Sequence, residues 1–101
     1  MRERRPRNPL ESLTFTDGRI VRCKLSRGEV RLEFRDHRDV TRQIKFTEVI
    51  DLSRSDRATD HDVMEGSFDF SNGTWTLRLV DDDDQTLLQI EYRTAELTSG
   101  G

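Results

Sequence analysis

The chain has 101 residues, of which 32% are apolar and 37% are charged, and it carries a formal net charge of -3 with one cysteine. This length fits one small domain, and a single cysteine excludes both an internal disulfide and a zinc site built from several cysteines. No stretch is long and apolar enough for a signal peptide or a membrane span, so we expect a cytoplasmic protein that does not bind membranes.

The first nine residues form a basic segment in front of an acidic body. They carry a charge of +3 from four arginines and one glutamate, which leaves -6 for residues 10–101. We expect a disordered arm at residues 1–9, a single domain at residues 10–97 and a flexible tail at residues 98–101. The arm is either a solvated tail or a nucleic-acid contact. The candidate contacts in the second case are its four arginines, Arg2, Arg4, Arg5 and Arg7.

From residue 11 onward, apolar and polar side chains alternate with a period of two, which is typical of β-strands with one buried face. Residues 11–16 predict a first strand and residues 19–25 a second. A three-residue loop ending at Gly18 in a left-handed conformation would join them and keep their apolar side chains on one face. The side chains expected to point inward are Leu13, Phe15, Val21, Cys23 and Leu25.

The next two strands are expected at residues 29–36 and 41–46, with their apolar side chains again facing inward. A two-residue turn at Arg27-Gly28 connects the first of them to the preceding strand. This turn sets the register, because it pairs Leu25 with Val30 and fixes every pair beyond them.

The alternation ends after Glu48, where the apolar spacing changes from two to three. This change predicts a bulge or a short helical turn. Residues 53–62 contain a single apolar side chain, that of Ala58, and they predict an exposed connection.

Residues 63–71 predict a long strand that ends at Asn72-Gly73, the strongest turn signal in the chain. A type I′ turn needs positive φ at both central residues, which asparagine and glycine accept. This turn pairs Phe70 with Trp75. The strand after the turn carries Trp75, Leu77 and Leu79, and residues 81–85 are a polar interruption. The register of the last strand, which follows, places Tyr92 beside Trp75. We therefore expect an aromatic cluster of these three residues.

These elements predict an all-β fold, an antiparallel meander of about seven strands. A polar connection separates four strands from three, so one sheet can fold over the other and bury both inner faces. The leading architecture is a small β-sandwich, and a flattened, partly open barrel fits the same pattern. No segment shows the period of an amphipathic helix.

The outward residues of the second, third and fourth expected strands make a basic face. Our register places Glu33 between Arg22 and Lys45. It also sets Lys24 opposite Arg31, a like-charge pair that destabilises a sheet. Such a face is either solvated or a docking surface for an acidic partner. The candidate partner-binding residues on it are Arg22, Lys24, Arg31, Arg35 and Lys45.

Val80 and Leu87 are predicted to pair on the outer face of the last hairpin. A facing apolar pair on an edge hairpin is a candidate contact for another protein or for an edge-strand homodimer. The four aspartates between them, residues 81–84, have two interpretations. They form either an exposed acidic turn that suits a basic partner, or a calcium site without the usual staggered ligands and glycine.

The sequence contains few residues that suit metal binding or catalysis. His37 and His61 lie in two expected loops, which would bind a metal such as zinc only if the loops converged. Cys23 has an inward phase, and burial makes a thiol inert. The sequence contains no phosphate loop, serine elbow or dinucleotide fingerprint. We therefore expect no catalytic residue, no bound metal and no cofactor.

Four segments carry a resemblance to known proteins: residues 13–17 (LTFTD), 30–34 (VRLEF), 44–49 (IKFTEV) and 88–92 (LQIEY). Their strand pattern resembles that of small uncharacterised all-β bacterial proteins, including some immunity proteins of polymorphic toxin systems. The resemblance implies a stand-alone, non-enzymatic binder of the kind that blocks a toxin. It carries over no functional residue.

The leading hypothesis is a non-enzymatic cytoplasmic domain that binds another protein, with immunity-type inhibition as the role that the resemblance implies. The alternative is a nucleic-acid-binding domain that uses the N-terminal arginines together with Lys24 and Arg31. A third hypothesis is a metal-dependent enzyme that uses His37 and His61. Salt titration separates the first two, because phosphate contacts lose affinity steeply as salt is added.

Overall fold

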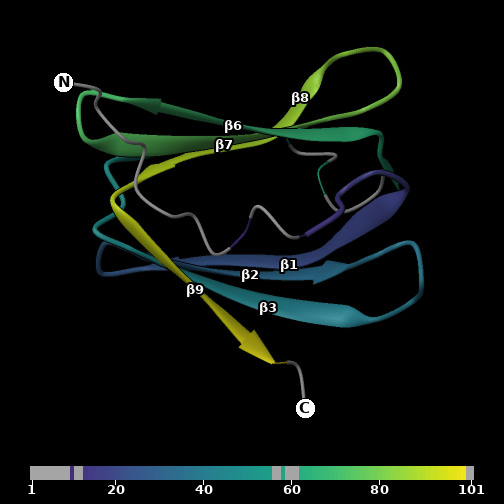
Figure 1. Ribbon diagram of the computed structural model, residues 1–101, viewed down its shortest axis with the longest axis horizontal. Coiled ribbons are helices and arrows are strands. Elements are labelled where there is room, and N and C mark those ends of the chain that lie inside the picture. Colours follow the sequence, from purple (N-terminus) through teal and green to yellow (C-terminus); the bar gives the residue numbers. More distant parts are fainter. Residues whose placement is uncertain (1–9, 11–12, 56–57, 59–61, 100–101) are drawn as a thin grey trace, which may run out of the picture.

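The computed structural model describes residues 10, 13–55, 58 and 62–99, and these form nine antiparallel strands in two sheets. The strands are β1 (Gly18–Ser26), β2 (Glu29–Arg35), β3 (Thr41–Thr47), β4 (Asp51–Arg54), β5 (Asp62–Val63), β6 (Glu65–Ser71), β7 (Thr74–Val80), β8 (Thr86–Tyr92) and β9 (Thr94–Ser99). The five-stranded sheet has the order β5-β1-β2-β3-β9, and the four-stranded sheet has the order β4-β8-β7-β6. One sheet lies over the other and one curves into a half-barrel, so the all-β prediction is confirmed (Figure 1). No helix in the described part of the chain is long and apolar enough to span a membrane.

The β1-β2-β3 meander forms as the alternation predicts. The Arg27-Gly28 turn has φ values of 51° and 75°, the two positive angles that a type I′ turn requires. It pairs Leu25 with Val30, which confirms the predicted register. The inward side chains of β2 and β3 are all buried: Val30, Leu32, Phe34, Ile44 and Phe46.

The first expected strand is wrong. Residues 13–16 form no strand, and the backbone N–H of Asp17 donates to the carbonyl of Val63 at 2.8 Å. The short strand β5 takes the edge position beside the start of β1, where Gly18 pairs with Val63. The expected hairpin is therefore absent, and so is its pairing of Leu13 with Val21. The left-handed residue is Asp17, with φ of 64°, instead of Gly18.

β1 contains a bulge between Ile20 and Arg22 that simple alternation does not reveal. The extra residue of a bulge shifts the two-residue alternation by one. On one side of the bulge, the side chains therefore point to the opposite face of the sheet from the one expected. Ile20 is therefore fully buried and Val21 is 37% exposed, the reverse of our expectation. Leu25 keeps the inward phase of Cys23, but it is 55% exposed because it lies next to the end of the strand.

The β6-β7-β8 meander also follows the predicted register as far as Leu79. The Asn72-Gly73 turn has φ values of 54° and 82°, and Phe70 pairs with Trp75. Trp75 pairs in turn with Tyr92 of β8. The aromatic cluster forms in part, because the Phe70 and Trp75 ring centroids are 4.9 Å apart. The Tyr92 ring instead contacts Phe46 of the other sheet, with a centroid distance of 4.7 Å.

Strands that depend on distant partners differ from the prediction. β4 uses Ser53 and Arg54 from the expected exposed connection and pairs with β8, and Ala58 of that connection is buried. The expected strand at residues 63–71 divides at Met64, so that β5 joins one sheet and β6 the other. β9 pairs with β3 and includes two residues of the expected flexible tail. The alternation of apolar and polar residues within a segment does not show which other strand will pair with it.

The phase change after Glu48 marks a crossing between sheets instead of a bulge or a helical turn. Glu48 has φ of 53°. The N–H of Val49 donates to the carbonyl of Gly28, next to β2, at 3.0 Å. The N–H of Ile50 donates to the carbonyl of Glu91 in β8 at 2.8 Å. The N–H groups of two successive residues thus bond to the β1–β2 turn of one sheet and to β8 of the other.

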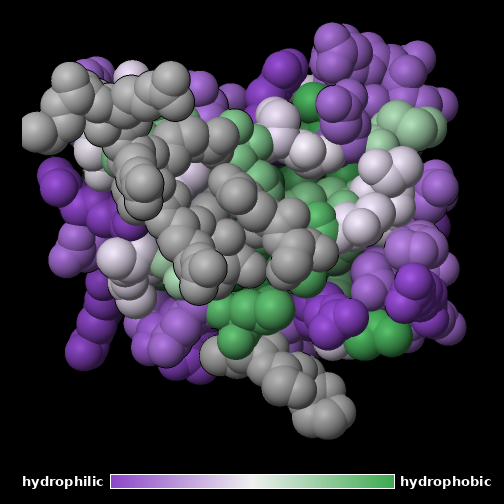
Figure 2. Space-filling model, viewed as in Figure 1, coloured by the Kyte–Doolittle hydropathy of each residue, from purple (hydrophilic) through white to green (hydrophobic). Residues whose placement is uncertain are grey.

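Phe15 packs between the two sheets although it lies outside any strand. Its side chain is 4% exposed, and its ring centroid lies 5.0 Å from that of Phe34 in β2 and 5.9 Å from that of Phe68 in β6. Gly66 in β6 makes room for this ring, since a Cβ there would lie 2.7 Å from a Phe15 ring carbon. Figure 2 shows hydrophobic surface in the middle of the view, between the two sheets, with hydrophilic residues on either side.

Candidate partner-binding groove

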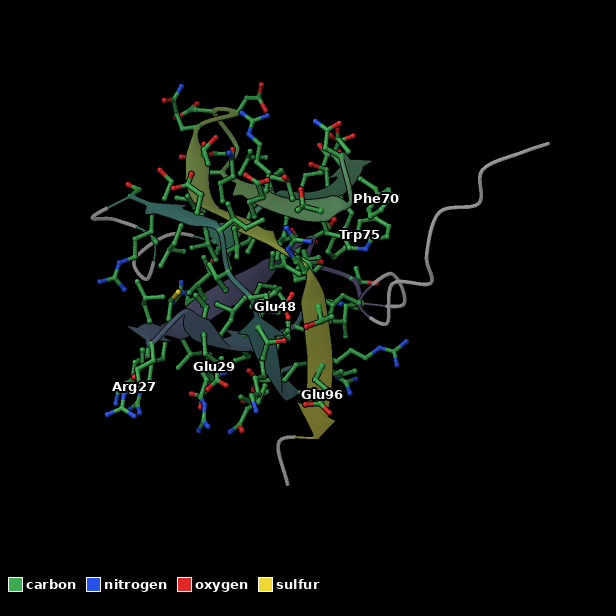
Figure 3. All side chains as sticks on the ribbon, turned by 90° about the vertical axis from the view of Figure 1, so that its left-hand side faces the viewer. Arg27, Glu29, Glu48, Phe70, Trp75 and Glu96 are labelled. Carbon is green, nitrogen blue, oxygen red and sulfur yellow. The ribbon has the colours of Figure 1, made fainter. Side chains whose placement is uncertain are left out.

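The outer face of the five-stranded sheet carries two rows of polar side chains across its strands. The first row runs across β1, β2, β3 and β9 through Lys24, Arg31, Lys45 and Glu96. The second row runs across β1, β2 and β3 through Arg22, Glu33 and Gln43. Figure 3 shows this face at the bottom of the view, where Glu29 and Glu96 project away from the four-stranded sheet.

Lys45 does not lie where the sequence placed it. We expected Glu33 between Arg22 and Lys45, but Glu33 pairs with Gln43 because the β2–β3 connection pairs Arg35 with Thr41. Lys45 lies opposite Arg31 instead. The predicted pair of Lys24 and Arg31 is confirmed, so three cations follow one another across β1, β2 and β3.

These rows surround a hollow of about 560 Å³, which we call the basic groove. Its charged lining consists of Arg22, Lys24, Arg31, Glu33, Lys45 and Glu96. Cations outnumber carboxylates in this lining, although the chain as a whole has a net charge of -3. A smaller hollow of about 180 Å³ shares Lys24 and Arg31 with the groove and extends to Ser26 and Glu29 beside the β1–β2 turn.

Glu29 binds two of the cations at one end of the groove. Its Oε2 accepts a hydrogen bond from Nε of Arg31 at 3.3 Å, and its Oε1 lies 3.4 Å from Nζ of Lys45. Partial desolvation opposes the ionisation of Glu29, but the hydrogen bonds and charges of Lys45 and Arg31 outweigh it and hold the pKa below its usual value. Glu29 therefore stays ionised at neutral pH.

Arg22 and Lys24 differ from the other two cations, because no described carboxylate lies within ion-pair distance of either. Lys24 also faces Arg31 across the β1–β2 ladder, and like charges directly opposite each other destabilise a sheet. Both side chains are exposed. They therefore offer positive charge to an anionic group that enters the groove.

Arg35, the remaining candidate on this face, is not part of the groove lining. It ends β2, and its Nε lies 3.7 Å from Oδ1 of Asp39 in the β2–β3 connection. The structure thus brings together four of the five cations predicted as partner-binding residues.

His37 lies exposed in the same connection, next to Asp36. Oδ1 of Asp36 accepts hydrogen bonds from the N–H groups of Val40 at 3.0 Å and Arg38 at 2.9 Å. The bond from Val40 is the main cause that lowers the pKa of Asp36. This carboxylate holds the connection in shape. His61 lies outside the described residues, so the convergence of the two histidine loops stays a prediction.

The expected apolar contact of Val80 and Leu87 is wrong, because both side chains are buried, with exposed fractions of 7% and 1%. A bulge between Leu79 and Val80 shifts the register, so Val80 pairs with Thr86. The backbone directly after β4 and directly after β5 also lies against them. The N–H of Ser55 donates to the Leu87 carbonyl, and the N–H of Met64 donates to the Val80 carbonyl.

The acidic turn at residues 81–84 is organised by its first residue. Asp81 is 5% exposed, and its Oδ1 accepts hydrogen bonds from the N–H groups of Asp83 and Gln85, both at 2.9 Å. Asp82, Asp83 and Asp84 are exposed, as the acidic-turn interpretation predicts, whereas Asp81 is not. Carboxylate oxygens of Asp81, Asp82 and Asp83 lie within 4.8 Å of one another. Backbone N–H groups of the turn bind the Asp81 carboxylate, and these hydrogen bonds account for the closeness of the three carboxylates.

We expect Asp81→Ala to lower the free energy of unfolding by about 1–3 kcal/mol, because two backbone N–H groups lose their acceptor. Asp82→Ala is the matched control, since Asp82 is exposed and no hydrogen bond to its side chain organises the turn. It should change stability by less than about 0.5 kcal/mol. Urea unfolding followed by tryptophan fluorescence measures both. Equal effects of the two substitutions would show that Asp81 has no special role.

Cys23 is buried, and this burial raises the pKa of its thiol even though the charge of Arg54 opposes the shift. The thiol therefore stays protonated, as its inward phase predicted. The four arginines of the N-terminal arm lie outside the described residues, so the nucleic-acid hypothesis for that arm stays a prediction.

The sequence interpretation missed the wall of the groove that β9 supplies. Its signal was present, because Ala95 and Leu97 alternate with Glu96 and are both partly buried. Only Arg93 separates β9 from β8, and this short break concealed the change of sheet.

No protein-family model, curated protein or solved structure matches this chain. The resemblance to small bacterial β-proteins therefore stays an expectation from strand pattern.

Proposed function

We propose that this protein is a non-enzymatic domain that binds an acidic segment of another protein in the basic groove. The observation that supports this most directly is the row of Lys24, Arg31 and Lys45 across three strands at a hollow of about 560 Å³. Positive charge gathered on one face of an otherwise acidic protein steers an acidic partner to that face. Arg31 adds a planar guanidinium, which suits paired hydrogen bonds to a carboxylate.

The composition of the lining favours recognition over catalysis. Covalent catalysis needs a nucleophile with an adjacent base. The described lining of the groove contains arginine, lysine, glutamate, glutamine and aliphatic residues, with no hydroxyl, thiol or imidazole group. Its polar groups are suited to hold carboxylates by charge and hydrogen bonds.

The placement of the aromatic residues favours a protein partner over nucleic acid. Proteins that bind single-stranded nucleic acid usually stack the bases on aromatic side chains within a basic groove. No aromatic residue lines this groove. Phe15, Phe34 and Phe46 pack between the sheets, on the opposite face of the five-stranded sheet.

Inhibition is one outcome of such binding, when the acidic segment belongs to the active site of the partner. The toxin-immunity role implied by the strand pattern is a specific form of this proposal.

The proposal is tested by capture from the native cell lysate with nuclease present, using a double variant that removes the two cations without ion pairs. Arg22→Gln with Lys24→Gln should weaken binding of the captured protein about tenfold or more, since each lost charge removes part of the electrostatic complementarity. Unfolding by urea should show unchanged or slightly higher stability, because the unfavourable facing of Lys24 and Arg31 is relieved.

The matched control removes two exposed cations that lie outside the groove, Arg38→Gln with Arg78→Gln. It should leave binding unchanged. A partner that binds both double variants equally well contradicts the groove as the binding surface. Capture that disappears with nuclease would favour the nucleic-acid alternative.

A further inference from the structure

β1 presents a free backbone edge beside the groove. β5 pairs only with Gly18 and Arg19 of β1, and no other described strand lies on that side of β1. From Arg22 to Ser26 the strand is therefore an edge of the five-stranded sheet. An edge of this kind displays N–H and C=O groups that can pair with another strand.

The geometry of the hairpin shows which groups face the edge. Ser26 and Glu29 flank the two-residue Arg27-Gly28 turn, so they form the hydrogen-bonded pair that closes it. Antiparallel pairs alternate between bonded and non-bonded positions. The N–H and C=O groups of Leu25 and Cys23 therefore point away from β2. In agreement, the Cys23 carbonyl accepts a hydrogen bond from Nη1 of Arg54 at 2.9 Å.

The side chains along this edge differ between the two faces of the sheet. On the outer face, Arg22 and Lys24 line the groove and form no ion pair with a described residue. On the inner face, Leu25 is apolar and 55% exposed. A strand laid along β1 would meet positive charge on one face and apolar surface on the other.

We propose that the acidic segment binds as an additional β-strand along residues 22–26 of β1, with acidic and apolar side chains in alternation. Its carboxylates lie over the groove beside Arg22 and Lys24, and its apolar side chains lie beside Leu25. Its backbone bonds the N–H and C=O groups of Cys23 and Leu25 that point away from β2, and it displaces Arg54 from the Cys23 carbonyl. This inference rests on the proposed function, because the same groove supplies the charges. A second copy of this chain does not fit, since β1 against β1 would bring arginine and lysine side chains together.

The probe is a capped peptide of four Glu-Val repeats, compared with the same peptide carrying N-methyl groups on its valine backbone nitrogens. N-methylation keeps the charge and removes hydrogen-bond donors, so it should weaken binding about tenfold or more. In amide hydrogen exchange, the N–H groups of Cys23 and Leu25 should exchange about tenfold more slowly with saturating peptide. The N–H groups of Lys24 and Ser26 already face β2 and should change little.

Equal affinity of the two peptides, with weaker binding of both to the Arg22→Gln and Lys24→Gln variant, would overturn strand addition and leave the groove as the binding surface. A peptide whose binding is insensitive to that variant would contradict the groove as well. Binding of polyglutamate but not of the alternating peptide would overturn the proposed alternation.

Discussion

Replacing Phe15 with alanine is expected to lower the free energy of unfolding by about 3–5 kcal/mol, the usual cost of removing a buried phenylalanine. The ring is 4% exposed and lies between Phe34 of one sheet and Phe68 of the other. Its removal leaves a cavity at the junction of the two sheets, and Gly66 has no side chain with which to fill it. A loss of this size is a large fraction of the stability of a small domain.

The measurement is equilibrium urea unfolding, with Phe15→Leu as the matched variant. Leucine keeps most of the apolar volume and should cost clearly less than alanine. Phe70→Ala is a second control, because Phe70 is only partly buried at the end of β6. An alanine variant at position 15 that loses less than about 1 kcal/mol would show that the segment before β1 is not packed as described.

Gly18→Ala is expected to lower the free energy of unfolding by about 3 kcal/mol, at the upper end of the usual cost of overpacking. A Cβ at this position would lie 2.1 Å from Cζ of the Phe34 ring and 2.8 Å from the backbone oxygen of Arg35. The ring is buried and contacts Phe15, so it cannot move aside freely. The backbone oxygen belongs to β2, opposite the start of β1, and can yield still less.

The double variant Gly18→Ala with Phe34→Leu separates this clash from a general loss of stability. Phe34→Leu removes the ring atoms that lie closest to the new Cβ, so the two substitutions should together cost less than the sum of their separate costs. Residues in contact typically couple by about 0.5–3 kcal/mol in such cycles. Additive costs in urea unfolding would mean that the Phe34 ring does not set the limit at Gly18.

The parts of the fold that the sequence predicts correctly are those defined by neighbouring residues. Two type I′ turns, at Arg27-Gly28 and Asn72-Gly73, fix the pairing of the hairpins on either side. The errors occur where a distant segment decides the outcome. β5 excludes residues 13–16 from the edge of β1, and a bulge after Ile20 exchanges its burial with that of Val21. The alternation of apolar and polar residues shows neither which strands will pair nor where a bulge will form.

The candidate site could be predicted in composition but not in arrangement. Four of its cations were identified from their outward phase, because alternation reports the face of a strand directly. The order of these cations across the sheet was not predicted correctly, because the length of the β2–β3 connection sets Lys45 opposite Arg31. The apolar pair of Val80 and Leu87 was misplaced for a related reason, because one bulge and a covering segment turn an apparent surface into core.

The lining of the groove includes Glu96 of β9, a strand that lies far along the chain from the other strands of the groove. Three walls come from the consecutive strands β1, β2 and β3, whereas Glu96 arrives on β9, after the chain has passed through the four-stranded sheet. Contacts between distant segments require the closure of long loops, and topologies that depend on them fold slowly. We therefore expect the groove to be completed late in folding. A partner that contacts all four walls would distinguish a finished molecule from a partly folded one, and its binding would stabilise the native state alone.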